Sequence, residues 1–336
     1  MRAKGITYDT GWVRYGANSL PTFDPGRVAS DLQLIRDELH CNAVRITGGD
    51  AGRIDTAASI AVDLGLEVWY SPYPLDLPQD EILTLFADCA ERAEKLRRRG
   101  GEIVFVAGAE LTLMCPGFLP GETFHDRIAP LVGRDPQMPQ LIETASARLK
   151  SFFESAVPLI RERFGGQVTY ASIQLDRVDW APFDLISIDL YRTAEIADQL
   201  PAGVRTYASM GKPLAITEFG CATFEGARDR GAQGLEIVEY DDETGVPLRL
   251  DGDYTRDEAG QAETIAELLE IFEAEGVDSA FVFLFALHDH PHRPGGHPRY
   301  DLDLASYGIV RVLENQPVPW TPKAAFGTIA DLYARA

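Results

Sequence analysis

Short unbroken runs of hydrophobic residues alternate along this chain with longer segments of helical periodicity. Such short continuous apolar runs are typical of strands that are buried on both faces of a parallel sheet. Between the runs, apolar residues recur every three or four positions, as in Val28, Leu32, Ile35 and Leu39, which would form one face of a helix. Expected strands are 6–8, 43–47, 66–70, 103–111, 168–173, 185–191, 213–218 and 280–285, and expected helices are 25–39, 54–64, 78–99, 141–160, 194–210, 257–275 and 322–334.

Regular alternation of strands and helices predicts a parallel sheet, and eight units in 336 residues match a (β/α)8, or TIM, barrel. We see no linker, so residues 1–336 are expected to form a single domain. Long loops are expected after the fourth strand (114–139), the seventh (222–256) and the eighth, whereas the helix after the fifth strand is nearly absent (176–182). A doubly wound open sheet is the alternative. It usually carries a glycine-rich phosphate-binding turn after strand one, and Asp9-Thr10-Gly11-Trp12 is not such a turn.

Charge and composition narrow the classes of partner. Asp and Glu number 52 against 31 Lys and Arg, and this acidic excess disfavours nucleic acid as a partner. No apolar run approaches the roughly 20 residues that cross a bilayer, and the start of the chain has no apolar signal region. Four cysteines without a Cys-x-x-Cys pair favour reduced thiols, so a cytoplasmic location is expected. No serine elbow, P-loop or dinucleotide fingerprint is present.

Two glutamates stand where buried strands are expected to end. Glu110 follows the run from Ile103, and Glu218 lies in Thr217-Glu218-Phe219-Gly220, at the end of the seventh run. In a barrel both would lie on one rim and face each other across its mouth. Hydrolysis of glycosides uses such a pair, one carboxyl group protonated and one ionised, about 5 Å apart for retention and 6.5–9.5 Å apart for inversion. A pair of rim glutamates held in salt bridges is the structural alternative.

This arrangement resembles the clan of (β/α)8 glycoside hydrolases that carry the acid/base on strand four and the nucleophile on strand seven. The resemblance implies that Glu110 is the acid/base and Glu218 the nucleophile of a retaining reaction without a cofactor. It also implies that Arg45, at the end of strand two, and Tyr191, at the end of strand six, support the nucleophile.

A narrower resemblance covers nearly the whole chain. It is to actinobacterial proteins labelled abortive infection proteins, through the motifs Tyr8-Asp9-Thr10-Gly11, Arg45-Ile46-Thr47-Gly48-Gly49-Asp50, Asp189-Leu190-Tyr191-Arg192, Thr217-Glu218-Phe219-Gly220-Cys221 and Ala305-Ser306-Tyr307-Gly308.

The chain departs from the clan at two positions. Ala109 stands where the clan has an asparagine that contacts the sugar 2-hydroxyl, and Phe285 to His288 offer no tryptophan as a sugar platform after strand eight. Two other functions therefore stay open beside the hydrolase. One is an acid/base lyase, isomerase or cyclase on the same rim, and the other is a non-catalytic, defence-associated binding protein.

Further candidates surround the expected mouth. Arg45 holds Glu218 ionised, or else pairs with Asp9 or Asp50, and Asp189 is expected to be a partner of Arg45 or Tyr191. Near-rim rings could stack on a substrate, and His288 is the member of the histidine-rich loop expected to reach the pocket. We expect no metal at that loop, because metal-dependent barrel hydrolases usually carry His-x-His on strand one. The supporting or substrate-binding candidates are Arg45, Tyr191, Asp9, Tyr8, Asp50, Trp69, Asp189 and His288, and the other candidate rings are Trp12, Tyr70 and Tyr73.

Overall fold

The computed structural model describes residues 1–14, 17–133, 136–241, 244–314, 316 and 319–335. Eight strands build the central sheet: β1 (Ala3–Asp9), β4 (Ala43–Gly48), β5 (Glu67–Pro72), β6 (Ile103–Ala109), β7 (Gln167–Ala171), β8 (Ile186–Asp189), β9 (Leu214–Phe219) and β12 (Ser279–Val282). Its helices are α1 (Pro25–Asp37), α2 (Ala51–Asp63), α3 (Gln79–Arg98), α4 (Leu111–Met114), α5 (Phe124–Val132), α6 (Met138–Arg161), α7 (Leu200–Ala208), α8 (Glu258–Ala274) and α9 (Ala324–Tyr333). Short hairpins pair β2 (Val13–Arg14) with β3 (Ala17–Asn18), β10 (Val238–Tyr240) with β11 (Pro247–Leu250), and β13 (Val310–Val312) with β14 (Trp320–Pro322).

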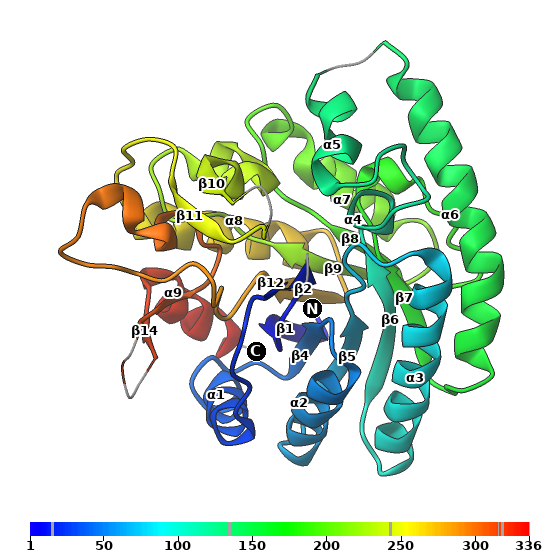
Figure 1. The fold of residues 1–336 in the computed structure, drawn as a ribbon. Helices are drawn as coiled ribbons and strands as arrows, with labels where there is room; N and C mark the ends of the chain where they lie inside the picture. Colours follow the sequence, from blue (N-terminus) through cyan, green and yellow to red (C-terminus); the bar gives the residue numbers. More distant parts are fainter. Residues whose placement is uncertain (15–16, 134–135, 242–243, 315, 317–318, 336) are drawn as a thin grey trace.

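The eight strands curl into a nearly closed barrel. They run parallel in the order β7-β6-β5-β4-β1-β12-β9-β8, and helices surround them on the outside (Figure 1). The two end strands meet at Ser172, which follows β7: its N–H donates to the carbonyl of Ser187 at 3.1 Å, and its carbonyl accepts from the N–H of Asp189 at 2.7 Å. The predicted (β/α)8 barrel in a single domain is confirmed.

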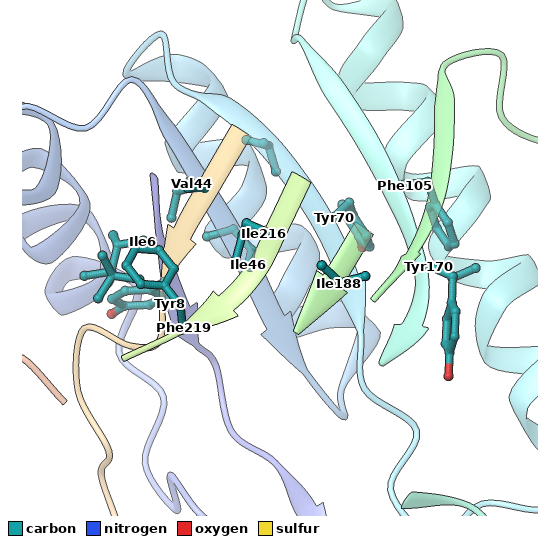
Figure 2. Packing of buried hydrophobic residues seen from close by; sticks show 14 of the residues in the cluster. Ile6, Tyr8, Val44, Ile46, Tyr70, Phe105, Tyr170, Ile188, Ile216 and Phe219 are labelled. Carbon is teal, nitrogen blue, oxygen red and sulfur yellow. The ribbon is translucent and has the colours of Figure 1, made fainter. Parts of the chain in front are cut away.

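Alternating residues of each strand face two different layers. Outward-facing side chains are apolar and pack beneath the helices; they include Ile6, Val44, Ile46, Tyr70, Phe105, Ile188 and Ile216 (Figure 2). The interior holds far fewer apolar side chains. Trp69 and Phe281 fill it, with ring centroids 4.7 Å apart, while Thr7, Arg45, Thr169 and Thr217 make the same interior polar. Since strand side chains alternate between faces, each barrel strand separates a dry outer core from a polar inner one.

One expected loop contains secondary structure. Residues 114–139 were predicted to be a loop, but α5 lies within them, begun by a capping box in which Thr123 and Asp126 each accept a hydrogen bond from the other's backbone N–H. Such reciprocal bonds satisfy amides that a helix start leaves unpaired. Residues 134–135 of the same loop, and residues 242–243 of the loop after β9, lie outside the described residues. The described remainder of that second loop carries short 3-10 turns and the β10–β11 hairpin.

Two strands end earlier than their hydrophobic runs. β6 stops at Ala109 and the chain turns into α4, while β12 stops at Val282, three residues before the expected end. Consequently Phe283, which was expected to lie inside the strand, stands at the mouth of the barrel and is half-buried.

The connection between β7 and β8, whose residues the structure describes throughout, contains no α-helix to cover the outside of the barrel. Only a 3-10 turn (Gln174–Asp176) connects them where a helix would normally lie, as the sequence predicted. A groove of about 500 Å³ remains on the outside there, between α6 and residues 176–182, lined by Phe153, Val157 and Val178 among others. Among the described residues, the helices include none that combines the length and the apolarity of a bilayer-crossing segment.

Candidate active site

Three carboxyl groups converge at the mouth of the barrel. Glu110 follows β6, Asp189 ends β8, and Glu218 lies on β9, where it is the ladder partner of Asp189. One carboxylate oxygen from each of the three residues lies within 4.8 Å of the other two. Asp189 and Glu218 are neighbours on adjacent strands, and closure of the barrel brings Glu110 to them from the other end of the strand order. We call Glu110, Asp189 and Glu218 the carboxylate cluster.

Glu218 is held by two donors. The Arg45 guanidinium donates to Oε1 at 2.6 Å, and the Tyr191 hydroxyl donates to Oε2 at 2.9 Å. Arg45 is itself fixed by the carbonyl of Thr217 at 3.2 Å and by the Ser71 hydroxyl at 3.1 Å, with 1% of its surface exposed. Both contacts fix the orientation of the Glu218 carboxylate. Of the two pairings expected for Arg45, the structure therefore has the one with Glu218 and not the one with Asp9 or Asp50.

Glu110 differs from Glu218 in backbone and surroundings. Its backbone is left-handed, with φ 47° and ψ 37°, a conformation that costs a non-glycine residue roughly 1–2 kcal/mol. The turn is fixed by its N–H, which donates to Ala171, and by its carbonyl, which accepts from Leu113 and Met114. Burial, followed by the charges of Asp189 and Glu218, raises the pKa of the Glu110 carboxyl well above its usual value. The half-buried side chain can therefore hold its proton at a pH at which an ordinary glutamate is ionised.

Asp189 is a buried acid that lies close to Glu218. It is 6% exposed, and the charge of Arg45 and a hydrogen bond with the Thr217 side chain favour its ionised form. Burial and the neighbouring charge of Glu218 raise the pKa of the Asp189 carboxyl well above its usual value. The sequence led us to expect Asp189 to support Arg45 or Tyr191 and not to act as a catalyst. The charge of Asp189 does help to raise the pKa of Arg45, and the supporting role itself stays a prediction.

Aromatic rings flank the carboxylate cluster in a connected series. Tyr191 meets Phe283 edge-on, Phe283 stacks on Trp12 with planes 2° apart and centroids at 6.0 Å, and Trp12 meets the edge of Tyr73. The charges of Glu110 and Glu218 add to burial in raising the pKa of the Tyr73 hydroxyl, so that end of the series also adjoins the carboxylates. We call Trp12, Tyr73, Tyr191 and Phe283 the aromatic wall.

Phe283 was missed by the sequence analysis, which looked for a ring between Phe285 and His288. A glycine next to it permits the close approach: Gly220 has φ 142°, and a Cβ there would lie 3.0 Å from the carbonyl of Phe283. The signal for Phe283 was present in the sequence, but the hydrophobic run extends past the true end of the strand.

Asp9 and His288 occupy a neighbouring part of the mouth. The Asp9 carboxylate accepts from the N–H of Gly11 at 2.7 Å and from the Ser19 hydroxyl at 3.2 Å, so it shapes the loop after β1. Burial raises the pKa of Asp9 to about 7, with a smaller contribution from Asp289. Burial lowers the pKa of His288 to about 4, which keeps its imidazole neutral near pH 7.

Three predicted supporting residues lie elsewhere. The Tyr8 hydroxyl donates to Asp31 on α1 at 3.1 Å and belongs to the outer core, and Asp50 caps α2 by accepting from the N–H of Arg53 at 2.8 Å. Trp69 is fully buried inside the barrel, where its Nε1 donates to Glu67 at 2.8 Å. It lies three residues before the end of β5 and is therefore part of the packed interior instead of the rim.

Two histidines of the histidine-rich loop are hydrogen-bonded to acidic side chains. His290 Nδ1 lies 2.7 Å from Asp289, and His292 Nδ1 lies 3.0 Å from Asp301. Within the described ranges, the carboxylate cluster is the group whose geometry could hold a metal ion. Burial raises the pKa of the Cys115 thiol to about 12 and that of Cys221 to about 11, so neither thiol is an activated nucleophile.

Comparison with known proteins supports the fold. No protein-family profile matches the chain, and no curated protein sequence does. Among solved structures, a complex of a GH113 β-1,4-mannanase aligns with a TM-score of 0.61 at 16% identity over 99% of both chains. GH113 β-mannanase AaManA from Alicyclobacillus acidocaldarius aligns with a TM-score of 0.58 at 15% identity, over 99% of this chain and 97% of that one.

A third similar structure is a part of a much larger protein. Bacteroides uniformis β-glucuronidase 2, covalently bound to a cyclophellitol aziridine, aligns with a TM-score of 0.58 at 12% identity, over 99% of this chain and 35% of that chain. At these identities the comparisons establish a shared (β/α)8 fold with glycoside hydrolases. They give no support to the resemblance to abortive infection proteins.

Proposed function

We propose that this chain is a glycoside hydrolase-like enzyme that cleaves a glycosidic bond with retention of configuration, with Glu218 as nucleophile and Glu110 as acid/base. The observation that carries the proposal is the geometry of the pair: one oxygen of each lies within 4.8 Å of the other. This separation suits the spacing of about 5 Å in retaining enzymes and leaves no room for the water molecule that inversion places between the groups.

The different surroundings of the two glutamates supply the two roles. Arg45 and Tyr191 orient the Glu218 carboxylate for attack on the anomeric carbon. Glu110 is kept protonated by burial and by its acidic neighbours, so it can donate its proton to the leaving oxygen. As the covalent intermediate forms, Glu218 loses its negative charge, and Glu110 can then act as base toward the incoming water.

The first prediction concerns the two glutamates. Replacing Glu218 by Gln removes the nucleophile, and we expect turnover of aryl glycosides to fall by at least about 10³-fold while the thermal unfolding midpoint is retained. Glu110→Gln should lose comparable activity on glycosides with poor leaving groups but much less on dinitrophenyl glycosides, whose leaving group needs no proton. Steady-state rates on the two substrate types measure this split. Equal activity of both variants and the parent protein contradicts the assignment.

A trapping experiment separates the proposal from the other acid/base reactions. A 2-fluoro glycoside with a good leaving group should label the protein with one sugar, and peptide mass spectrometry should locate that sugar on Glu218. A lyase, isomerase or cyclase reaction forms no glycosyl ester, so absence of the label together with turnover of another substrate would favour that class. Absence of turnover across aryl glycosides, with the site intact, would favour a binding protein.

A further inference from the structure

The strained turn at Glu110 is held from outside the mouth of the barrel. A left-handed residue other than glycine persists only where the surrounding structure fixes it. Helix α4 follows directly and is four residues long, and the start of such a helix leaves N–H groups that need acceptors from elsewhere. The N–H of Leu111, its first residue, donates to the Tyr170 hydroxyl on β7 at 2.8 Å. Tyr170 is fully buried, so this bond is shielded from water.

The carboxylate of Asp176 completes this support. Its Oδ2 accepts from the Tyr170 hydroxyl at 2.9 Å and from the N–H of Ile173 at 3.1 Å, and its Oδ1 accepts from the Thr112 hydroxyl. Asp176 is 1% exposed. One buried carboxylate is therefore joined to α4 twice, directly through Thr112 and indirectly through Tyr170. We call Thr112, Tyr170 and Asp176 the support network.

The short connection between β7 and β8 brings Asp176 to this position. Its 3-10 turn follows closely on the end of β7, so Asp176 lies beside the strand that carries Tyr170. Burial raises the pKa of the Asp176 carboxyl to about 6, whereas its hydrogen bonds with Thr112 and Tyr170 favour the ionised form. The charge of Asp176 in turn helps to raise the pKa of Glu110. The support network thus acts on Glu110 through both geometry and charge.

The support network bears on one of the two proposed catalytic glutamates. Glu218 is held by a different pair of donors, Arg45 and Tyr191. Helix α4, by contrast, closes on the Glu110 carbonyl, which accepts two of its N–H groups at 2.9 Å. A shift of α4 would therefore move Glu110 and leave Glu218 in place.

We propose that Tyr170 and Asp176 are positioning residues for Glu110, which hold the left-handed turn so that its carboxyl group meets the leaving-group oxygen. The inference rests on the proposed function, in which Glu110 is the acid/base. Tyr170 belongs to the outer core and Asp176 lines the groove on the outside of the barrel, so both act through the turn and not by contact with the substrate. A displacement of about 1 Å at a reacting group can cost on the order of 100-fold in rate.

The variant Tyr170→Phe removes the hydroxyl at the centre of the support network and keeps the ring. For the sugar whose aryl glycoside the parent protein hydrolyses best, kcat/KM of the phenyl glycoside is expected to fall about 10- to 100-fold, because its leaving group needs the proton of Glu110. The dinitrophenyl glycoside of the same sugar should lose less than about 3-fold, because its leaving group departs without a proton. A variant that is merely less folded loses the same fraction with both substrates, so the ratio of the two values measures positioning.

Amide hydrogen exchange tests the support of the turn without any turnover. In Tyr170→Phe the N–H of Leu111 loses its acceptor, and NMR should show the amides of α4 exchanging at least about 10-fold faster than in the parent protein. Thr112→Val breaks the direct bond to Asp176 and is expected to raise the same rates. Asp176→Leu removes both links and should have the largest effect. The other two variants test the support network even if Asp176→Leu does not fold.

A matched control is Tyr8→Phe. The Tyr8 hydroxyl donates to the buried Asp31 at 3.1 Å, and burial raises the pKa of Asp31 to about 6, as it does for Asp176. Tyr8 lies on β1 and Tyr170 on β7 (Figure 2), and three strands separate β1 from β7 in either direction around the barrel. The control therefore loses an equivalent bond far from α4, and neither the exchange of the α4 amides nor the ratio of kcat/KM values should change.

The possible outcomes separate this inference from the proposed function. Unchanged exchange of the α4 amides in Tyr170→Phe overturns the inference, as does faster exchange with no loss of kcat/KM or with an equal loss on both glycosides. Effects of the same size in Tyr8→Phe overturn it as well. Hydrolysis by the parent protein that Tyr170→Phe leaves unaffected would still be consistent with the proposed function. Absence of hydrolysis by the parent protein contradicts the proposed function, and the exchange rates then decide on their own whether the support network holds the turn.

Discussion

Two buried groups of charges in this molecule are built in opposite ways. In the first, around Arg256, every acid meets a base: Arg256 pairs with Asp303 at 2.7 Å and with Asp301 at 3.0 Å, and Lys323 pairs with Asp303 at 2.9 Å. In the second, the carboxylate cluster, three acids share Arg45. The first group joins the start of α8 to the loop after β12 and to α9, while the second faces the mouth of the barrel.

Proton affinities follow the same division. Burial opposes ionisation of Glu258 beside Arg256, but the hydrogen bonds and charge of Arg311 outweigh it and hold the Glu258 pKa below its usual value. At Glu110 and Asp189, burial is reinforced by acidic neighbours, and both pKa values rise. In a buried group whose charges are balanced, each acid and base supports the fold, because removing one leaves its partner unpaired. In a group with an excess of acids, the carboxyl groups bind protons or cations more tightly than usual.

The largest loss of stability is expected from removing Arg256, which pairs with Asp301 and Asp303. Arg256→Met leaves Asp301 and Asp303 with fewer partners in buried positions, and breaking such a pair costs roughly 3 kcal/mol of unfolding free energy after allowance for the partial exposure of Arg256. Urea unfolding at pH 7 measures the loss. Arg249→Met, which removes an exposed arginine from its pair with Glu239, should change little. Equal losses in the two variants would contradict the comparison.

A gain in the free energy of unfolding is expected from removing one acid of the carboxylate cluster. The folded-state pKa of Asp189 is raised, so the folded protein binds a proton more tightly than the unfolded chain does, and stability falls as the pH rises from about 4 toward that raised pKa. Asp189→Asn removes this fall, so we expect the variant to gain about 1–2 kcal/mol over the parent at pH 8 and little at pH 4. Unfolding midpoints across pH measure the difference. If the stability of Asp189→Asn relative to the parent were lower at pH 8 than at pH 4, the raised folded-state pKa of Asp189 would be contradicted.

The smallest effect is expected where an ion pair is exposed. Asp63 pairs with Arg99 at 2.9 Å, with 65% and 52% of the two side chains accessible to solvent. Asp63→Asn should change stability by less than about 0.5 kcal/mol, since water screens the pair. Together the three variants test whether burial and compensation, instead of the number of ion pairs, set the energetic role of a charge. A loss at Asp63 comparable with that at Arg256 would remove the distinction.

Much of the architecture could be predicted because the hydrophobic runs record the alternation of strands and helices. The run 103–111 nevertheless extended past Ala109, since an apolar run reads the same in a strand and in the buried turn that follows it. Helix α5 was missed although Thr123 and Asp126 have the spacing of a capping box. Glycine and proline around it favoured the prediction of a loop.

Some residues of the candidate site could also be predicted from the sequence, and others could not. Glu110 and Glu218 were predicted because each follows a hydrophobic run and strand ends share one rim, whereas the roles of Arg45 and Tyr191 were implied by the resemblance to (β/α)8 glycoside hydrolases. Trp69 was misplaced because its depth depends on where β5 stops, at Pro72. The raised pKa of Asp189 could not be predicted, because it depends on burial and on the charge of Glu218 nearby in space and not on the neighbouring sequence.

The left-handed backbone of Glu110 has a consequence for how this protein varies among its relatives. Glycine adopts this backbone conformation with less strain than glutamate, so folding by itself favours glycine at this position. The barrel is expected to tolerate that substitution. A glutamate can persist there only while something other than folding selects it. Relatives that keep an acid at this turn are therefore expected to share the proposed activity, and any relative with glycine there is expected to lack it.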